Sequence, residues 1–172
     1  MTLLLLLAME NVFIVYGAWL ESEFGLATAT IGAVSVVISL AEMLAEGLSA
    51  GLVDRLGKRR AVLGGFVLLL LALLLLPRLS GALATALAGM ALFIFAFEFT
   101  VVSFVPLISE VMPSARGPVL ALNVAAMSVG RLVATLTAPR LWAAGGLSAN
   151  ALASGVMLAA GILILWRVVR ER

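Results

Sequence analysis

Five ionisable side chains lie inside long apolar stretches of this sequence, where charge is least expected. They are Glu10, Glu42, Glu46, Glu98 and Arg131. A charged side chain at the centre of a bilayer costs about 2.5 to 3.5 kcal/mol even on lenient scales. Because proteins tolerate that cost where a partner or a water-filled cavity is available, the pattern predicts a functional site at membrane depth.

Four carboxylates and one guanidinium cannot all stay charged in a medium of low dielectric constant, so at least one carboxyl group is expected to take up a proton. Helical rise places Glu98 and Arg131 at one depth, roughly 18 to 20 Å from the same membrane face, and we expect them to pair. Glu42, with Glu10 or Glu46, is then the expected proton site. The alternative is that the carboxyl groups stay protonated and hydrogen-bond between helices as structural elements, with Arg131 a structural counter-ion.

Polar and aromatic residues on the same stretches are candidates for a substrate site. They are Asn11, Tyr16, Trp19 and Asn123. Aromatic faces attract organic cations, so a cationic or amphipathic solute is expected. Trp19 has a second interpretation, as part of the aromatic belt at the membrane surface.

The stretches that carry these residues have the composition of membrane spans. The chain is 64% hydrophobic and 12% charged, with a mean hydropathy of +1.24, far outside the range of soluble domains. A helix needs about 20 apolar residues to cross a bilayer, and glycine or proline breakers separate six such segments. They fall near residues 3–20, 28–52, 60–77, 82–109, 118–141 and 148–168. The sequence therefore predicts an all-α integral membrane protein, and the first segment is expected to be a retained span rather than a signal peptide.

The composition limits chemistry that depends on reactive side chains. The sequence has no cysteine and no histidine, and Asp54 is its sole aspartate. These absences remove disulfides, the usual zinc and haem ligands, thiol nucleophiles, histidine-based catalysis and a paired-aspartate protease. We therefore expect no enzymatic activity and no cofactor. No basic patch alternates with aromatic residues, so no nucleic-acid partner is expected.

A short charged loop separates the second and third segments. Its central residues are Asp54, Arg55, Gly57, Lys58 and Arg59. The loop resembles the motif G-x-x-x-D-R-x-G-R-R of the major facilitator superfamily, which lies between the second and third helices of each six-helix half. Ala50 stands where the family favours glycine, and Gly51 follows one place later. Glycine at position 57 allows a tight backbone turn, and the cations can meet lipid phosphates or a carboxylate. The alternative is a cationic loop that only anchors the topology.

The resemblance implies one six-helix half, made of two three-helix repeats at about residues 1–80 and 81–172. Residues 110–117 and 120–123 look like the corresponding part of the carboxyl-terminal half of bacterial efflux-type members. In that fold the third and sixth helices lie outermost, and the other four border a central cavity. The distribution of charge is consistent with this, because residues 61–76 contain no charge or amide and helices that are apolar all round face lipid.

Positive charge is distributed unequally between the two ends of the predicted spans. Six alternating spans place eight Lys and Arg residues on one side and two on the other. The richer side holds Arg55, Lys58, Arg59, Arg60, Arg116, Arg167, Arg170 and Arg172, and the poorer side holds Arg78 and Arg140. Because cytoplasmic loops carry the excess of positive charge, both termini are expected in the cytoplasm. The resemblance to bacterial members implies the inner membrane.

A single half would leave its charged residues facing lipid, which requires a partner. Since both termini are expected on one side, two parallel copies about a twofold axis would rebuild a cavity. We therefore expect a homodimeric half-size transporter that moves a small organic solute, for which a cationic or drug-like molecule is the candidate, by alternating access coupled to protons. Two alternatives stay open: an isolated half or interaction protein that completes another six-helix protein, and a channel-like assembly lined by glutamates.

Overall fold

Helices make up nearly all of the structure, a computed structural model that describes residues 1–111 and 113–168. In chain order the elements are α1 (Thr2–Phe13), α2 (Tyr16–Phe24), α3 (Thr28–Val34), α4 (Val36–Leu56), α5 (Lys58–Leu75), η1 (Leu76–Leu79), α6 (Leu83–Val111), η2 (Pro113–Ala115) and α7 (Arg116–Val168). Within these described ranges, five helical stretches are long and apolar enough to cross a membrane: Thr2–Phe24, Thr28–Ser49, Lys58–Leu79, Leu83–Ser109 and Arg116–Arg167. The prediction of an all-helical membrane chain is therefore confirmed for this part of the molecule. Arg170 and Arg172, which the orientation argument counts, lie outside the described residues.

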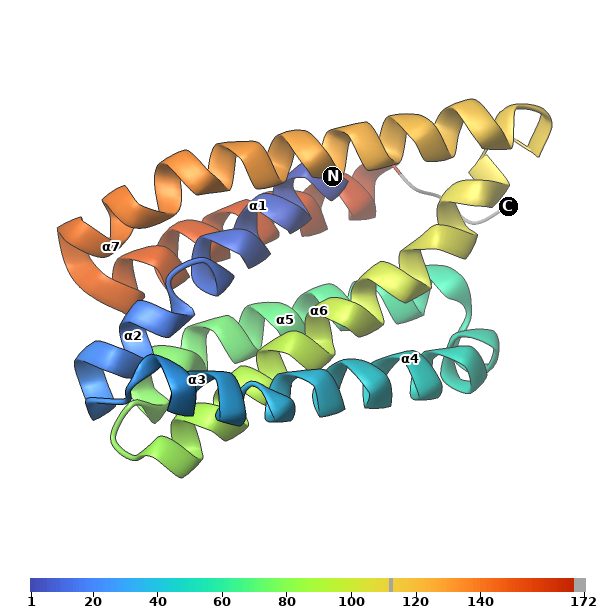
Figure 1. The fold of residues 1–172 in the computed structure, drawn as a ribbon. Coiled ribbons are helices and arrows are strands. Elements are labelled where there is room, and N and C mark those ends of the chain that lie inside the picture. Colours follow the sequence, from blue (N-terminus) through green and yellow to red (C-terminus); the bar gives the residue numbers. More distant parts are fainter. Residues whose placement is uncertain (112, 169–172) are drawn as a thin grey trace.

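The last helix, α7, is 53 residues long, and its backbone breaks in the middle. Gly145 has φ −168° and ψ 26°, and Gly146 has φ 60° and ψ −155°. Glycine adopts the positive φ found at Gly146 at little cost because it has no Cβ. Figure 1 shows the chain reversing direction at this break. We call the residues before the break the first arm of α7 and those after it the second arm.

The two amino-terminal spans are each divided by a local break. α1 and α2 meet at Val15, whose φ and ψ are −96° and −2°, and α3 passes into α4 at Ser35. At each break a backbone N–H bonds three residues back, from Val15 to Val12 O and from Ile38 to Ser35 O. This is the pattern of a tightened 3-10 turn. Each of the predicted segments 3–20 and 28–52 is therefore two helices rather than one.

Most of the buried apolar residues form one large core, and a smaller cluster joins α4, α5 and α6. α1 packs along α7, while α6 packs against α4 and α5, and α5 also contacts α7 (Figure 1). Phe66 and Leu69 of α5 and Phe93 and Ile94 of α6 are fully buried in this core. In a membrane, close packing of this kind holds helices together, because lipid removes most of the hydrophobic driving force between them.

Large apolar side chains are exposed on α4, α5 and α7, and to a smaller extent on α6. On α4 the exposed set is Val36, Leu40, Met43, Leu44, Leu48, Leu52 and Leu56, and on α5 it is Val67, Leu71, Leu74 and Leu75. Apolar faces of this extent need either lipid or another protein to cover them. The five ionisable side chains within the spans lie on α1, α4, α6 and the first arm of α7, and none of them lies on α5.

Candidate membrane-embedded site

An ion pair joins α1 to the first arm of α7. Arg131 Nε donates a hydrogen bond to Glu10 Oε1 at 2.5 Å. The Glu10 side chain is 8% exposed and that of Arg131 is 65% exposed. An ionised carboxylate that is buried without a partner is strongly unfavourable, so the guanidinium of Arg131 provides the counter-ion that the burial of Glu10 calls for.

Gly130 explains how the two helices come close enough for this pair. A Cβ at position 130 would lie 2.5 Å from the backbone oxygen of Leu3 and 3.2 Å from the backbone nitrogen of Leu7. No side chain fits at that distance, and small residues are the usual means by which membrane helices approach each other closely. The glycine therefore lets the first arm of α7 lie directly against α1, one residue before the arginine.

The prediction that Arg131 pairs with Glu98 is wrong, because its partner is Glu10. Counting residues from the ends of spans gives the depth of a side chain, but not the direction in which it points around the helix axis. α7 packs extensively along α1 and much less on α6. The carboxylate that Arg131 reaches is therefore one on α1.

The other three carboxylates form an acidic cluster on α4 and α6, consisting of Glu42, Glu46 and Glu98. Glu98 is half-buried, and Glu42 and Glu46 lie near enough for their charges to act on it. Glu42 is half-buried and Glu46 is exposed, one helical turn further on. No ion pair to these three carboxylates is present among residues 1–111 and 113–168. The three carboxylates therefore bring like charges together on two neighbouring helices.

The charged loop turns at Gly57. This residue ends α4 and begins α5 with φ 82° and ψ 138°, and its N–H donates to Val53 O at 3.0 Å. The turn predicted at Gly57 is confirmed, since a positive φ of this kind favours glycine. Asp54 and Arg55 are exposed on the last turn of α4.

The loop also contacts the second arm of α7. Arg59 Nη2 donates to the backbone oxygen of Trp166 at 3.3 Å. Lys58 and Arg59 occupy the first turn of α5. The loop is thus connected to a helix far away in the sequence, as a segment that responds to helix movement would be.

Asn11 lies inside the helix packing rather than at a cavity. It is fully buried; Thr137 Oγ1 donates to its Oδ1 at 2.7 Å, and Asn150 Nδ2 donates to its backbone oxygen at 2.6 Å. Asn150 Nδ2 also donates to Ala138 O at 3.0 Å. These bonds join α1 to both arms of α7. Sequence reasoning missed Asn150 and Thr137; a lone amide in an otherwise apolar span was the available signal.

The two aromatic candidates also have partners within the chain. The Tyr16 hydroxyl shares a hydrogen bond with Ser35 Oγ, and its ring stacks on Phe13 with centroids 5.5 Å apart. Trp19 is 2% exposed and meets Phe24 edge-on at 6.3 Å. A residue of an interfacial belt is expected to face the lipid headgroups, so the burial of Trp19 does not fit that interpretation.

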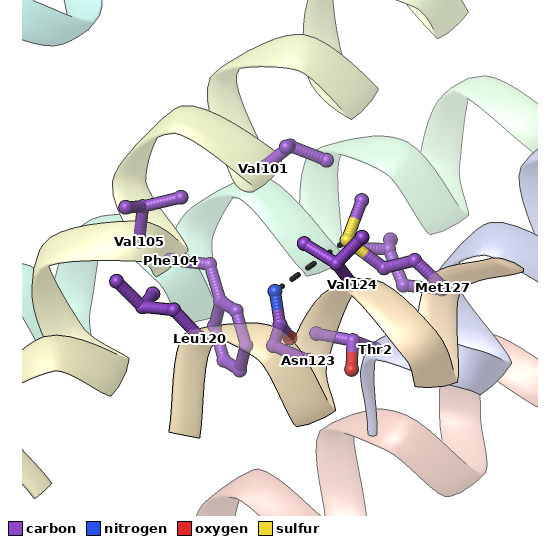
Figure 2. A pocket seen from close by; sticks show the side chains of 9 residues that line it. Thr2, Val101, Phe104, Val105, Leu120, Asn123, Val124 and Met127 are labelled. Carbon is purple, nitrogen blue, oxygen red and sulfur yellow. Dashed lines mark hydrogen bonds between the residues drawn. The ribbon is translucent and has the colours of Figure 1, made fainter. Parts of the chain in front are cut away.

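Among the substrate candidates, Asn123 lines a pocket. A pocket of about 380 Å³ lies between α1, α6 and the first arm of α7. It is lined by Thr2, Leu5, Val101, Phe104, Val105, Leu120, Asn123, Val124 and Met127. Figure 2 shows the Asn123 amide nitrogen directed at the sulfur of Met127, with a separation of 3.5 Å. Asn123 Oδ1 is buried without a hydrogen-bond partner.

Comparison with known proteins identifies a family and a curated relative. A family model described as Major Facilitator Superfamily matches residues 1–172. The "Uncharacterized MFS-type transporter YceJ" of Bacillus subtilis (strain 168) is 28% identical over 126 residues, which cover 73% of this chain and 32% of the relative. The chain therefore matches about a third of that relative's length. No solved structure matches.

Proposed function

The chain belongs to the major facilitator superfamily, and from that premise we propose that it is half of a membrane transporter for a small, drug-like organic solute, driven by protons through alternating access. The observation that carries the proposal is the set of ionisable side chains on α1, α4, α6 and the first arm of α7. Charge at membrane depth is expensive unless it faces water or a partner. A cavity between two halves supplies both.

The proposed half has six membrane helices if the two arms of α7 cross separately. The chain then divides into three-helix repeats at about residues 1–80 and 81–172. Two such halves in parallel, related by an axis along the membrane normal, form the usual transporter of this architecture. A second copy of the chain is one source of the other half, which makes the active form a homodimer.

A different six-helix domain is the second source of the missing half. The curated relative extends well beyond the aligned segment, which makes up 32% of the relative's length. Under this alternative the chain does not transport alone and completes another protein. The two versions differ in the mass of the purified complex.

Proton coupling is assigned to the acidic cluster of Glu42, Glu46 and Glu98. Glu10 already has a cation, whereas these three carboxylates have none among the described residues. Protonation of the cluster would remove mutual repulsion and alter the contact between α4 and α6. The loop of Asp54, Arg55, Gly57, Lys58 and Arg59 is the segment proposed to respond to that movement.

The excess of Lys and Arg on one side supports an orientation with both termini in the cytoplasm. We propose the inner membrane of a bacterium as the location, in line with the relative from Bacillus subtilis. The proposed partners are the lipid bilayer, the second half, the solute and protons. The proposal includes no cofactor.

Transport by the purified chain in liposomes tests this function. We expect a pH gradient to drive uptake of an organic solute, and Glu98→Gln to reduce that uptake to the level of protein-free liposomes. Solute exchange without a gradient should survive in this variant, because it needs no net proton movement. Glu21→Gln is the matched control, since Glu21 is exposed near the end of the first span.

The mass of the complex in mild detergent, measured by light scattering, distinguishes a homodimer from a chain whose second half is a different protein. A mass of two chains supports the homodimer, and a mass of one chain favours a different second half. Gradient-driven uptake that is unchanged in Glu98→Gln would contradict the assignment of the proton site. Flux that never saturates with solute would point to a channel.

A further inference from the structure

A second pocket continues the one around Asn123. It has a volume of about 260 Å³ and is lined by Leu6, Val124, Met127, Ser128 and Arg131. Val124 and Met127 line both pockets. The two hollows therefore form one groove along the first arm of α7. We call this the α1–α7 groove, and it extends from Leu120 to Arg131, roughly 16 Å at the rise of a helix.

The walls of the groove are apolar over most of its length. Aliphatic side chains, the Phe104 ring and the thioether of Met127 form most of its surface. Ligand pockets of this kind bind through apolar contact, and a few polar atoms fix the orientation of the ligand. The combined hollow is large enough for a small organic molecule.

Two polar groups of the groove have hydrogen-bonding atoms that no described residue occupies. Asn123 Oδ1 is buried and has no hydrogen-bond partner, so it can accept from a donor on a ligand. At the other end Arg131 uses its Nε for Glu10. Its terminal amino groups form no hydrogen bond with any residue in the described ranges, and its side chain is 65% exposed. A guanidinium has five N–H donors, so most of them stay available.

We propose that the α1–α7 groove binds a small amphipathic carboxylate. The apolar body of the molecule occupies the hollow around Phe104 and Met127, and its carboxylate accepts hydrogen bonds from the terminal amino groups of Arg131. Arginine is the residue best suited to hold a carboxylate through two parallel bonds. The claim that this carboxylate is the transported solute rests on the proposed function. The claim that the groove binds it does not.

The geometry favours an anion over the cation that the aromatic residues suggested. Trp19 is buried and Tyr16 is hydrogen-bonded to Ser35, so neither ring lines the groove. Glu10 and Arg131 are the charged groups at this end of the groove, and the exposed member is the cation. None of the three carboxylates of the acidic cluster lines either pocket, although Glu98 lies about one helical turn before Val101 on α6.

Binding to the purified chain in detergent tests the proposal, without any transport step. Three fluorescent probes share a pyrene ring on a four-carbon chain and end in a carboxylate, a hydroxyl or a trimethylammonium group. We expect the carboxylate probe to bind about tenfold more tightly than the other two, as a charge-assisted pair with arginine predicts. Empty micelles give the background partition of each probe.

Three variants locate the site. Val124→Phe fills the groove from an exposed position and should weaken binding of the carboxylate probe about tenfold. Leu132→Phe, also exposed but outside the groove, is the matched control and should leave the affinity unchanged. Arg131→Lys keeps the charge for Glu10 but loses the planar fork, so the preference for carboxylate over hydroxyl should fall to about threefold or less.

Equal affinity for the three probes would overturn the proposal, and is the result expected if a lipid acyl chain is the natural occupant. Unchanged binding in a folded Val124→Phe variant, judged by its thermal unfolding, would overturn it as well. Failure of gradient-driven transport leaves this binding result untouched. If Arg131→Lys lost the preference for the carboxylate probe and still transported the solute, the transported solute would bind elsewhere in the protein.

Discussion

The Glu10–Arg131 pair is asymmetric, because only one of its two members is buried. The carboxylate is enclosed by helix packing, while the guanidinium is largely exposed. Removing a partner from a buried pair leaves an uncompensated charge, whereas an exposed charge can be hydrated. The two members should therefore differ in their effect on stability when each is replaced.

Replacing Arg131 should destabilise the protein more than replacing Glu10. We expect Arg131→Gln to lower the free energy of unfolding by about 3 kcal/mol, because Glu10 then stays buried without a cation. Glu10→Gln should cost clearly less, and the double variant should be more stable than Arg131→Gln alone. Thermal unfolding in one detergent measures all four proteins. Strictly additive effects would show that the two side chains do not interact in solution.

The sequence was sufficient to identify which charged side chains lie within the spans. It was not sufficient to predict which of them form an ion pair. All five ionisable groups were visible because charge inside a span is rare. Their depths also follow from helical rise. The partner of Arg131 depends on how far each helix is rotated about its own axis, which interhelical packing decides and a single sequence does not encode locally.

At the scale of helices, the contact between α1 and the first arm of α7 depends on the absence of a side chain. A methyl group at Gly130 would meet the backbone of Leu3, which cannot rotate away as a side chain can. Backbone contact this close forces the helices apart. Any such movement would also separate Arg131 from Glu10.

Gly130→Ala should therefore reduce stability although alanine favours helix formation. The expected loss is about 1 to 3 kcal/mol, typical of overpacked contacts. Gly47→Ala in α4 is the control, because a Cβ there meets nothing within 4 Å, and it should raise stability by up to about 1 kcal/mol. Unfolding midpoints of the two variants in the same detergent give the comparison. Equal midpoints would mean that α1 and α7 are not in close contact.

Helix boundaries were predictable where the backbone itself requires a particular residue. The breaks at Gly57 and at Gly145–Gly146 fall where glycine stands in the sequence, and Gly57 and Gly146 have positive φ. The breaks at Val15 and Ser35 were not predicted, because neither position carries a strong helix breaker.

At the scale of the whole molecule, two kinds of exposed surface must be covered in different ways. From Val67 onward the exposed side chains of α5 are all apolar, as at Leu71 and Leu74. The first arm of α7 exposes Ser128 and Arg131 as well as apolar side chains such as Leu132. The proposed function requires lipid on the first surface and a water-filled cavity, closed by a second half, on the other. Sequence composition alone could identify the polar helices, but not the surfaces on which they meet.

Reactivity of single cysteines in reconstituted protein separates these surfaces most directly. The chain has no cysteine of its own, so Ser128→Cys and Leu71→Cys each add one thiol, both at exposed positions. A charged thiol reagent that does not enter lipid reacts only with a thiolate in contact with water. We predict rapid labelling of Ser128→Cys and none of Leu71→Cys in the bilayer, with both labelled after unfolding. Absence of labelling at position 128, or equal labelling at both positions, would contradict a shared aqueous cavity lined by the charged helices.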